Sequence, residues 1–274
     1  LHYHRWSRWV SKQYPNGVYH GELAKVEDYQ KSVPAFLVEH IVSKNAKLGI
    51  TTVVIGEDWQ TAATIIRLHK LLQERGLSEN ALLFWNANNV FGFEAVDFKE
   101  LSKACRLLTI SRYMKERMRA MELDTLVVPN GIPSRFWSRV DRKTGSELRE
   151  LYPDLLLTKV GRFHPDKRWL MAIEAVSLLK EKGFKPTLLV RGAGEDYGEV
   201  VRRRAGELGL SWAVAQAAQG DHATILAALL RAGQADVVEL GFFVPEAFLR
   251  TLYWASTAVL ANSGHEPFGL VGLE

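Results

Sequence analysis

Short apolar runs rich in β-branched residues alternate with longer segments of helical periodicity along this chain, and the alternation recurs in two blocks. The runs that predict strands are 51–55, 81–85, 107–110 and 125–128 in the first block, and 155–160, 187–190, 237–240 and 258–261 in the second. Helical segments of about 10–15 residues between such runs are typical of parallel strands joined by helical crossovers. The sequence therefore predicts an α/β fold with two doubly wound parallel sheets.

A charged stretch without apolar periodicity, residues 133–144, separates the two blocks. The expected domains are an N-terminal one at 1–135, a linker at 136–150 and a C-terminal one at 151–274. The chain begins at Leu1 and ends at Glu274, directly after an apolar run that contains glycine. Both domains are therefore expected to be incomplete at the chain ends.

Composition excludes several classes of protein. Apolar residues make up 47% and charged residues 24% of the 274 residues, as in ordinary globular chains. A formal charge of +4 is too weak a field to predict nucleic-acid binding. Cys105 is the only cysteine, so neither an internal disulfide nor a cysteine-ligated metal centre is expected.

Several sequence signals are missing from the chain. No apolar run reaches the ~18 residues of a membrane span, and no secretory signal is recognisable. We therefore expect a cytoplasmic location, and a peripheral membrane contact stays open. There is neither a P-loop motif nor an Asp-x-Asp pair, and His2 and His4 form an isolated HxH near the terminus. No metal and no cofactor are expected.

Functional side chains are expected beyond the carboxyl ends of the parallel strands, where ligands of such sheets bind. Strand 155–160 runs into Gly161, which permits a turn, followed by Arg162 and, five residues on, Lys167. A guanidinium fork and an ammonium group suit the two sides of a diphosphate. The alternative is that both are solvated surface cations.

Strand 258–261 runs into the segment with the most information. Pro267 lies just before an expected helix that begins near Gly269, and free N–H groups at a helix start bind anions. Glu266 and Glu274 would lie roughly 10 Å apart along such a helix, which suits two ends of an elongated ligand. The alternative is a loop and a surface helix with scattered acids.

Polar residues also follow two strands of the first block. Glu57, Asp58 and Trp59 come after strand 51–55, and Asn86, Ala87, Asn88 and Asn89 follow strand 81–85, facing the same side. Asp58 has a simpler explanation as a helix N-cap.

One rival function rests on Gly192 and Gly194, a GxG pair that follows strand 187–190. A nicotinamide-dependent oxidoreductase would need an acidic residue about 20 positions on, at the end of the next strand. The region 211–221 is rich in Ala and Gln and indicates a poor strand, which disfavours this function.

Taken in order, the motifs resemble those of a known family over residues 50–274. The stretch from Glu266 to Glu274 resembles the Glu-x7-Glu motif of retaining GT-B glycosyltransferases, especially family 4, and Gly161–Lys167 resembles their Gly-Arg-…-Lys loop. Further segments fit in the same order: Glu57–Thr61, Ser111–Lys115, Val128–Ile132 and Leu240–Pro245. The first of these resembles the His-Asp-Trp-Gln-Thr of glycogen and starch synthases.

The resemblance implies two Rossmann-like domains facing a cleft, and a metal-independent transfer of a hexose from a UDP-, ADP- or GDP-sugar to a carbohydrate or other hydroxyl acceptor. It implies that Glu266, Arg162 and Lys167 are catalytic, with Arg162 and Lys167 on the diphosphate and Glu266 near the transferred sugar. It implies further donor-binding residues: Gly161; Gly241, Phe242 and Phe243, which would flank the base; the backbone amides of Phe268, Gly269 and Leu270, which would bind the phosphates; and Glu274, which would bind the ribose. On the acceptor side it implies Glu57, Asp58, Trp59, Asn86 and Asn88.

The chain departs from the family at two places. Glu57 stands where the synthase group has His, and the first βαβ unit of the N-terminal domain is missing, which leaves the activity of this polypeptide open. The alternatives are a non-catalytic GT-B-like nucleotide-binding or scaffold protein, and a GT-B epimerase or phosphorylase. The base, the sugar and the acceptor are not identified by the sequence.

Overall fold

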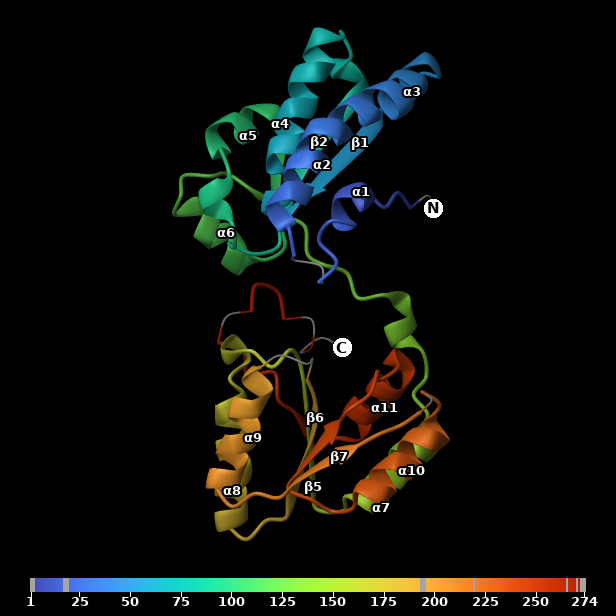
Figure 1. Cartoon of the computed structure of the whole chain (residues 1–274), viewed down its shortest axis with the longest axis vertical. Coiled ribbons are helices and arrows are strands. Elements are labelled where there is room, and N and C mark those ends of the chain that lie inside the picture. Colours follow the sequence, from blue (N-terminus) through green and yellow to red (C-terminus); the bar gives the residue numbers. More distant parts are fainter. Residues whose placement is uncertain are drawn as a thin grey trace. The chain divides into compact units, whose positions relative to one another are not determined.

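In the computed structural model, the chain separates into two compact units, residues 1–130 and 131–274. The structure describes residues 3–16, 20–192, 196–218, 220–264, 266–269 and 271. Each unit holds one parallel sheet with helices beside it (Figure 1). The prediction of an α/β chain with two Rossmann-like parallel sheets is confirmed.

Unit 1 contains a four-stranded sheet in the order β1-β2-β3-β4. Its strands are β1 (Thr52–Glu57), β2 (Ala81–Ala87), β3 (Arg106–Thr109) and β4 (Leu126–Val127). Its α-helices are α1 (Arg8–Ser11), α2 (Glu22–Phe36), α3 (Ser43–Lys47), α4 (Asp58–Glu74), α5 (Phe98–Ala104) and α6 (Arg112–Arg119). All three strand pairings are parallel, and Glu57 at the end of β1 lies opposite Asn86 of β2. The register therefore places the polar residues after these two strands side by side.

The helical region before β1 is longer than the sequence predicts. A helix is expected over 34–43, but α2 begins at Glu22 and continues through π-helical turns at Leu37–Val42 into α3. Pro34 lies inside α2, where it removes a backbone hydrogen bond and makes the sequence read as a helix start. Packing of α2 against α4 buries Val33 and Pro34 and outweighs this local cost.

Helix α4 covers one face of the unit 1 sheet with a stripe of buried apolar residues at helical spacing: Ala62, Ile65, Leu68 and Leu72. On β1 and β2, three apolar side chains remain more than half exposed: Val53, Ile55 and Leu82. Parallel strands are usually covered on both faces, so the uncovered residues mark the other face of the sheet.

Unit 2 contains a five-stranded parallel sheet in the order β7-β8-β6-β5-β9. Its strands are β5 (Leu155–Val160), β6 (Pro186–Arg191), β7 (Trp212–Ala215), β8 (Val237–Leu240) and β9 (Ala258–Val259). Its α-helices are α7 (Arg142–Leu151), α8 (Trp169–Glu181), α9 (Tyr197–Glu207), α10 (His222–Ala232) and α11 (Glu246–Ala255). Helices α8 and α9 cover one face, and α7, α10 and α11 cover the other (Figure 1). This is a doubly wound sheet.

The strand order of unit 2 reverses next to β5. On one side of β5 the chain adds β6, then the edge strand β7, and then β8, which lies between β7 and β6. It then returns so that β9 pairs with the opposite side of β5. In open α/β sheets the crevice at such a reversal is the usual ligand site. The loops after β5 and β9 therefore occupy the position where a ligand is expected.

Two elements of unit 2 differ from the sequence-based expectations. Residues 212–215 form β7 although the region indicates a poor strand; β7 pairs with β8, and the Trp212 indole donates to Glu239 of β8 at 3.2 Å. Most of the expected linker is helix α7, capped by Asp141 and packed so closely against α11 that a Cβ on Gly145 would lie 2.5 Å from the Trp254 ring. Contacts from distant parts of the chain stabilise both elements.

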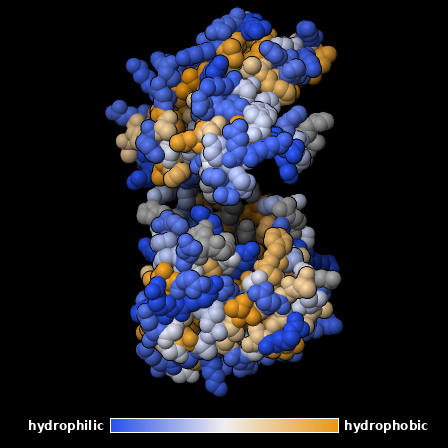
Figure 2. Space-filling model, viewed as in Figure 1, coloured by the Kyte–Doolittle hydropathy of each residue, from blue (hydrophilic) through white to orange (hydrophobic). Residues whose placement is uncertain are grey.

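On the face of the molecule shown in Figure 2, hydrophilic residues cover most of the surface, with hydrophobic residues scattered among them. Within the described ranges, no helix is both long enough and apolar enough to cross a bilayer.

Candidate functional site

The loop after β5 is anchored at both of its ends. The Gly161 amide donates to the Arg191 carbonyl of β6 at 3.0 Å, and the buried Trp169 indole donates to the Arg162 carbonyl at 2.7 Å. Inside the loop, the buried Phe163 ring packs on Trp169 with centroids 4.7 Å apart. The exposed Arg162 and the half-buried Lys167 therefore extend from a loop whose backbone is held by hydrogen bonds to β6 and to Trp169 of α8.

The glycines after β6 have a packing explanation. A Cβ on Gly192 would lie 2.0 Å from the Phe163 ring, and one on Gly198 would lie 3.0 Å from it. The glycines therefore make room for Phe163. The next strand, β7, is followed by Gln216 and Ala217 rather than the acidic residue that a nicotinamide site needs. Gly194 lies outside the described residues.

The loops after β5 and β9 meet at an ion pair. Lys167 Nζ donates to Glu266 Oε2 at 2.6 Å, although the two residues are 99 positions apart. Their side chains are 26% and 38% exposed, so the pair is open to solvent and to a ligand. The structure thus brings together two of the three residues expected to be catalytic, and Arg162 belongs to the same loop as Lys167.

Sequence reasoning missed one residue of this region. Lys159, next to last in β5, is 2% exposed and donates to the Leu260 carbonyl at 3.2 Å and to Asn262 Oδ1 at 2.5 Å. Burial and the positive charge of Lys167 lower the pKa of Lys159 to about 8. The one available signal is a lysine inside an otherwise apolar strand, Leu-Leu-Leu-Thr-Lys-Val.

The segment after β8 carries three residues expected beside the base. The Gly241 amide donates to the Ala215 carbonyl at 3.0 Å, and a Cβ on Gly241 would lie 2.4 Å from the Gln216 amide nitrogen. Phe242 packs partly into the core, whereas the Phe243 ring is 78% exposed. Phe243 is therefore available for stacking.

The last expected site residues are only partly described. Phe268 is half-buried, and Gly269 has φ +83°, a left-handed conformation that lies outside a right-handed helix. Leu270 and Glu274, expected at the phosphates and the ribose, lie outside the described residues.

In unit 1 the expected polar residues form a hydrogen-bonded cluster at the carboxyl ends of β1 and β2. Asn86 and Asn88 both donate their side-chain amides to Glu57 Oε2, at 2.9 and 2.7 Å. The backbone N–H of Asn88 donates to Asp58 Oδ1 at 2.9 Å. Two amides thus orient one carboxylate oxygen of the exposed Glu57.

Asp58 does not cap α4. It is the first residue of that helix, and its side chain accepts from the β2 loop instead. Its φ of +58° is rare for a residue other than glycine. Burial raises the pKa of Asp58, Glu57 raises it further, and the Asn88 hydrogen bond opposes the rise. A strained, partly desolvated acid at a strand end is a common feature of functional sites.

The Trp59 ring lies beside this cluster and packs directly against the backbone of Gly92. A Cβ on Gly92, whose φ is +74°, would lie 2.3 Å from the Trp59 ring. Within the described part of the chain, the buried Trp59 Nε1 and Asn86 Oδ1 have no hydrogen-bond partner. Both atoms are closed off from solvent, so they mark incompletely satisfied polar groups inside the wall of this cluster.

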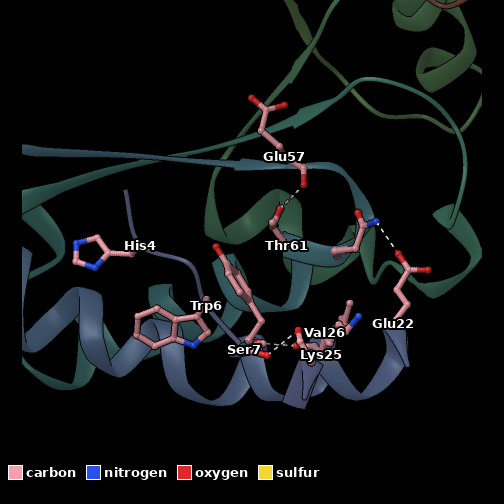
Figure 3. Close-up of a pocket in the computed structure, with 11 residues that line it drawn as sticks. His4, Trp6, Ser7, Glu22, Lys25, Val26, Glu57 and Thr61 are labelled. Atoms are coloured by element: carbon pink, nitrogen blue, oxygen red, sulfur yellow. Dashed lines mark hydrogen bonds between the residues drawn. The ribbon is translucent and has the colours of Figure 1, made fainter. Parts of the chain in front are cut away.

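A cavity of about 470 Å³ lies in unit 1 beside the start of α4. Its lining residues come from three segments: His4, Trp6, Ser7 and Ser11; Glu22, Lys25, Val26 and Tyr29; Glu57, Gln60 and Thr61. Figure 3 shows the Glu57 side chain directed away from the others, so Glu57 lines the cavity through its backbone. Gln60 donates to Glu22 at 3.2 Å across the cavity wall. An indole face beside planar amide and carboxylate groups suits a hydroxyl-rich ligand.

Among the described residues, no group of three or more His, Cys, Asp or Glu side chains is arranged to hold a metal ion. Neither unit therefore offers a built metal centre in the part of the chain that can be described.

Comparison with known proteins gives matches at the level of structure. No protein-family model matches the chain, and no curated protein matches it significantly. The sucrose-phosphate synthase of Thermosynechococcus elongatus aligns with a TM-score of 0.53 at 18% identity, covering 89% of this chain and 58% of that one. A UDP-forming α,α-trehalose-phosphate synthase from Burkholderia vietnamiensis aligns with a TM-score of 0.58 at 13% identity, covering 90% and 59%.

A third match is an E. coli trehalose-6-phosphate protein bound with UDP-2-fluoro glucose, with a TM-score of 0.53 at 14% identity, covering 89% of this chain and 59% of that one. The chain thus spans less than two thirds of the length of these structures. Identities this low carry the fold alone. The chain has the GT-B fold, with one Rossmann-like sheet in each unit.

Proposed function

We propose that the chain is the donor- and acceptor-binding part of a retaining glycosyltransferase of the family 4 type, which moves a hexose from a nucleotide-sugar to a hydroxyl acceptor. The observation that supports this most is the meeting of Lys167 and Glu266 at the strand reversal of unit 2, beside Arg162. Cations for a diphosphate and a carboxylate for a sugar lie together there. The Glu-x7-Glu resemblance supports the finer family assignment and retention.

The chemistry follows from where charge develops. Departure of the sugar leaves extra negative charge on a nucleoside diphosphate and positive charge on the sugar ring. Arg162 and Lys167 stabilise the leaving diphosphate, and Glu266 stabilises the ring as its positive charge grows. These residues supply the stabilisation themselves, so no metal or cofactor is needed in this proposal. Glu274 accepts the ribose hydroxyls with its two oxygens.

The acceptor belongs to unit 1 in this proposal. The Glu57 carboxylate, oriented by Asn86 and Asn88, accepts hydrogen bonds from sugar hydroxyls, and Asp58 and Trp59 complete that surface. The neighbouring cavity, with Trp6, Glu22 and Gln60 in its wall, has room for a sugar ring. Carbohydrates and other polyols fit this set of acceptors and ring faces.

Titration calorimetry of UDP, ADP, GDP and NAD into the chain tests the proposal. UDP is the first ligand to try, because two of the matched structures are described as UDP-forming and as bound with UDP-2-fluoro glucose. We expect one nucleoside diphosphate to bind in the micromolar range and NAD to bind much more weakly. Preferential binding of NAD, or no binding of any nucleotide, would contradict the proposal.

The replacement of the synthase-type His by Glu57 supports one alternative, a GT-B-like protein that binds a nucleotide without catalysis. The discriminating measurement is hydrolysis or transfer from a UDP-hexose by the whole protein. A protein that binds UDP but neither transfers nor hydrolyses the sugar would establish this alternative.

A further inference from the structure

Lys159 is the one buried ammonium group beside the candidate donor site among the described residues. Its Nζ contacts two oxygens, the Leu260 carbonyl and Asn262 Oδ1, and lies 5.1 Å from the centroid of the Trp169 ring. Burying an ammonium group away from any carboxylate costs free energy. A methionine of similar length would fill the same space without that cost. The function of the lysine is therefore to be sought in its hydrogen bonds.

Those hydrogen bonds act on the segment that leads from β9 to Glu266. The same segment is bonded to the loop after β5 at two further points: Asn262 Nδ2 donates to the Arg168 carbonyl at 3.2 Å, and the Gly264 amide donates to the Asp166 carbonyl at 2.7 Å. Asn262 thus accepts from Lys159 and donates to the residue after Lys167. Lys159 lies under the junction of the two loops that carry Lys167 and Glu266.

We propose that Lys159 is a positioning residue for the candidate donor site: its ammonium group holds segment 260–264 against β5 and thereby sets the distance between Lys167 and Glu266. The inference rests on the proposed function for its consequence in ligand binding. The positioning itself is a property of the chain and is measurable without ligand. Hydrogen bonds from a charged donor are stronger than those between neutral groups, so the two from Lys159 add substantially to the backbone bonds that also hold this segment.

Two isosteric variants test the inference: Lys159→Met and Asn262→Leu remove the hydrogen bonds and keep the volume. We expect each to accelerate amide hydrogen exchange at Gly264 at least tenfold, because its bond to Asp166 opens when the segment is released. Amides of β6 and β8 should keep their wild-type rates. The double variant should show less than the sum of the two single effects, because both variants break the bond between Lys159 and Asn262, although each also breaks one further bond, to the carbonyl of Leu260 or of Arg168. Lys185→Met, at an exposed lysine of the same unit, is the control.

A purely space-filling role predicts a different result. Asn262→Asp keeps an oxygen that accepts from Lys159, so it should retain more of the wild-type protection at Gly264 than Asn262→Leu does. Unchanged Gly264 exchange in Lys159→Met, or additive effects in the double variant, would overturn the inference. If Lys159→Met does not fold, the Asn262→Leu and Asn262→Asp pair decides by the same criterion.

The ligand readout separates this inference from the proposed function. Where the wild-type chain binds UDP, we expect Lys159→Met to weaken binding about fivefold to tenfold, with no change in Lys185→Met; an unchanged affinity for UDP would remove the link to the donor site. Where the wild-type chain binds no nucleotide, the proposed function fails, and Gly264 exchange still judges the positioning role.

Discussion

The two units place their polar clusters at the same point of the same kind of sheet, yet the clusters carry opposite charge. At the strand ends of unit 1, Glu57 and Asp58 are surrounded by side-chain and backbone amides. At the strand ends of unit 2, Lys159 and Lys167 lie close enough for one to lower the pKa of the other. Parallel sheets direct both sets of side chains to their carboxyl ends. The fold therefore fixes where a ligand binds, and the residues at the strand ends fix which ligand it is.

The strand order adds a second difference. The unit 2 order reverses beside β5, so two loops that are far apart in sequence converge at one place, whereas the four described strands of unit 1 follow one another across the sheet. Convergence lets Lys167 and Glu266 meet across 99 positions, but the unit 1 cluster comes from neighbouring strands. In the proposed function this suits a diphosphate-sugar, because its anionic end calls for cations and its sugar end for a carboxylate.

The two units have one packing feature in common. In each, an aromatic ring after one strand packs directly against a glycine that follows the neighbouring strand. Alanine at Gly92 would meet the Trp59 ring at 2.3 Å, and alanine at Gly192 would meet the Phe163 ring at 2.0 Å. We expect either change to lower the free energy of unfolding by about 1–3 kcal/mol, because the added methyl forces the ring or the backbone to move. Urea unfolding followed by tryptophan fluorescence measures the loss.

Two matched controls separate the causes. Gly76 has φ +66° and open space around its Cβ position, so Gly76→Ala should show only the backbone cost, about 1 kcal/mol. Gly206 lies in α9 with nothing near it, and Gly206→Ala should be neutral or stabilising. If Gly92→Ala costs no more than Gly76→Ala, the ring contact has no part in holding Trp59.

The charge difference predicts that a nucleoside diphosphate depends on unit 2 cations. We expect Arg162→Ala to lower the affinity for UDP roughly tenfold to a hundredfold, because a lost charge-assisted hydrogen bond costs about 1.5–3 kcal/mol. Arg203→Ala, at an exposed arginine of α9, should leave the affinity unchanged. An Arg162→Ala affinity within about twofold of wild type would mean that this loop does not hold the diphosphate.

These expectations show how far the sequence reaches. The bounds of β5 and β8 are those predicted from their apolar runs, because buried parallel strands leave a local signal. The carboxyl ends of parallel strands lie at one edge of a sheet. This rule predicts that Glu57 lies close to Asn86, and that Lys167 lies close to Glu266. The roles of these residues remain predictions.

What the sequence could not predict depends on distant partners. β7 exists because it pairs with β8, whose Val237 lies 25 positions after Trp212. Lys159 contacts residues 101 and 103 positions further on, and a single lysine in an apolar strand has no periodicity to reveal them. By local rules Pro34 indicates the start of a helix, yet α2 continues on both sides of Pro34 because α2 packs against α4.

The two clusters should also respond to pH with opposite signs. The folded pKa of Lys159, about 8, lies below its usual 10.5, so between these values the unfolded chain binds more protons and stability rises with pH. The folded pKa of Asp58 lies above its usual 3.8, chiefly through burial, so stability falls as pH rises from 3.8 to that value. Each slope is at most about 1.4 kcal/mol per pH unit.

Urea unfolding across pH 4–10 checks both signs with one variant for each unit. Asp58→Asn should remove the fall at low pH, and Lys159→Met should remove the rise above about pH 8. A wild-type stability that falls between pH 8 and 10 by a slope absent from Lys159→Met would show that the ammonium group is stabilised, not penalised, by its surroundings.

The smallest expected effect concerns Glu266, the one negatively charged residue in the otherwise positively charged cluster described in unit 2. Glu266 pairs with Lys167, but the two side chains are 26% and 38% exposed, and such pairs contribute about 0–1 kcal/mol. Loss of the carboxylate leaves Lys167 available to a phosphate, so Glu266→Gln should change the affinity for UDP by no more than about twofold. In the whole enzyme the same change should lower kcat, because Glu266 is proposed to act only as positive charge grows on the sugar ring. A tenfold loss of UDP affinity with unchanged kcat would instead place Glu266 on the nucleotide. The donor would then be bound the other way round, with its nucleotide where this proposal places its sugar.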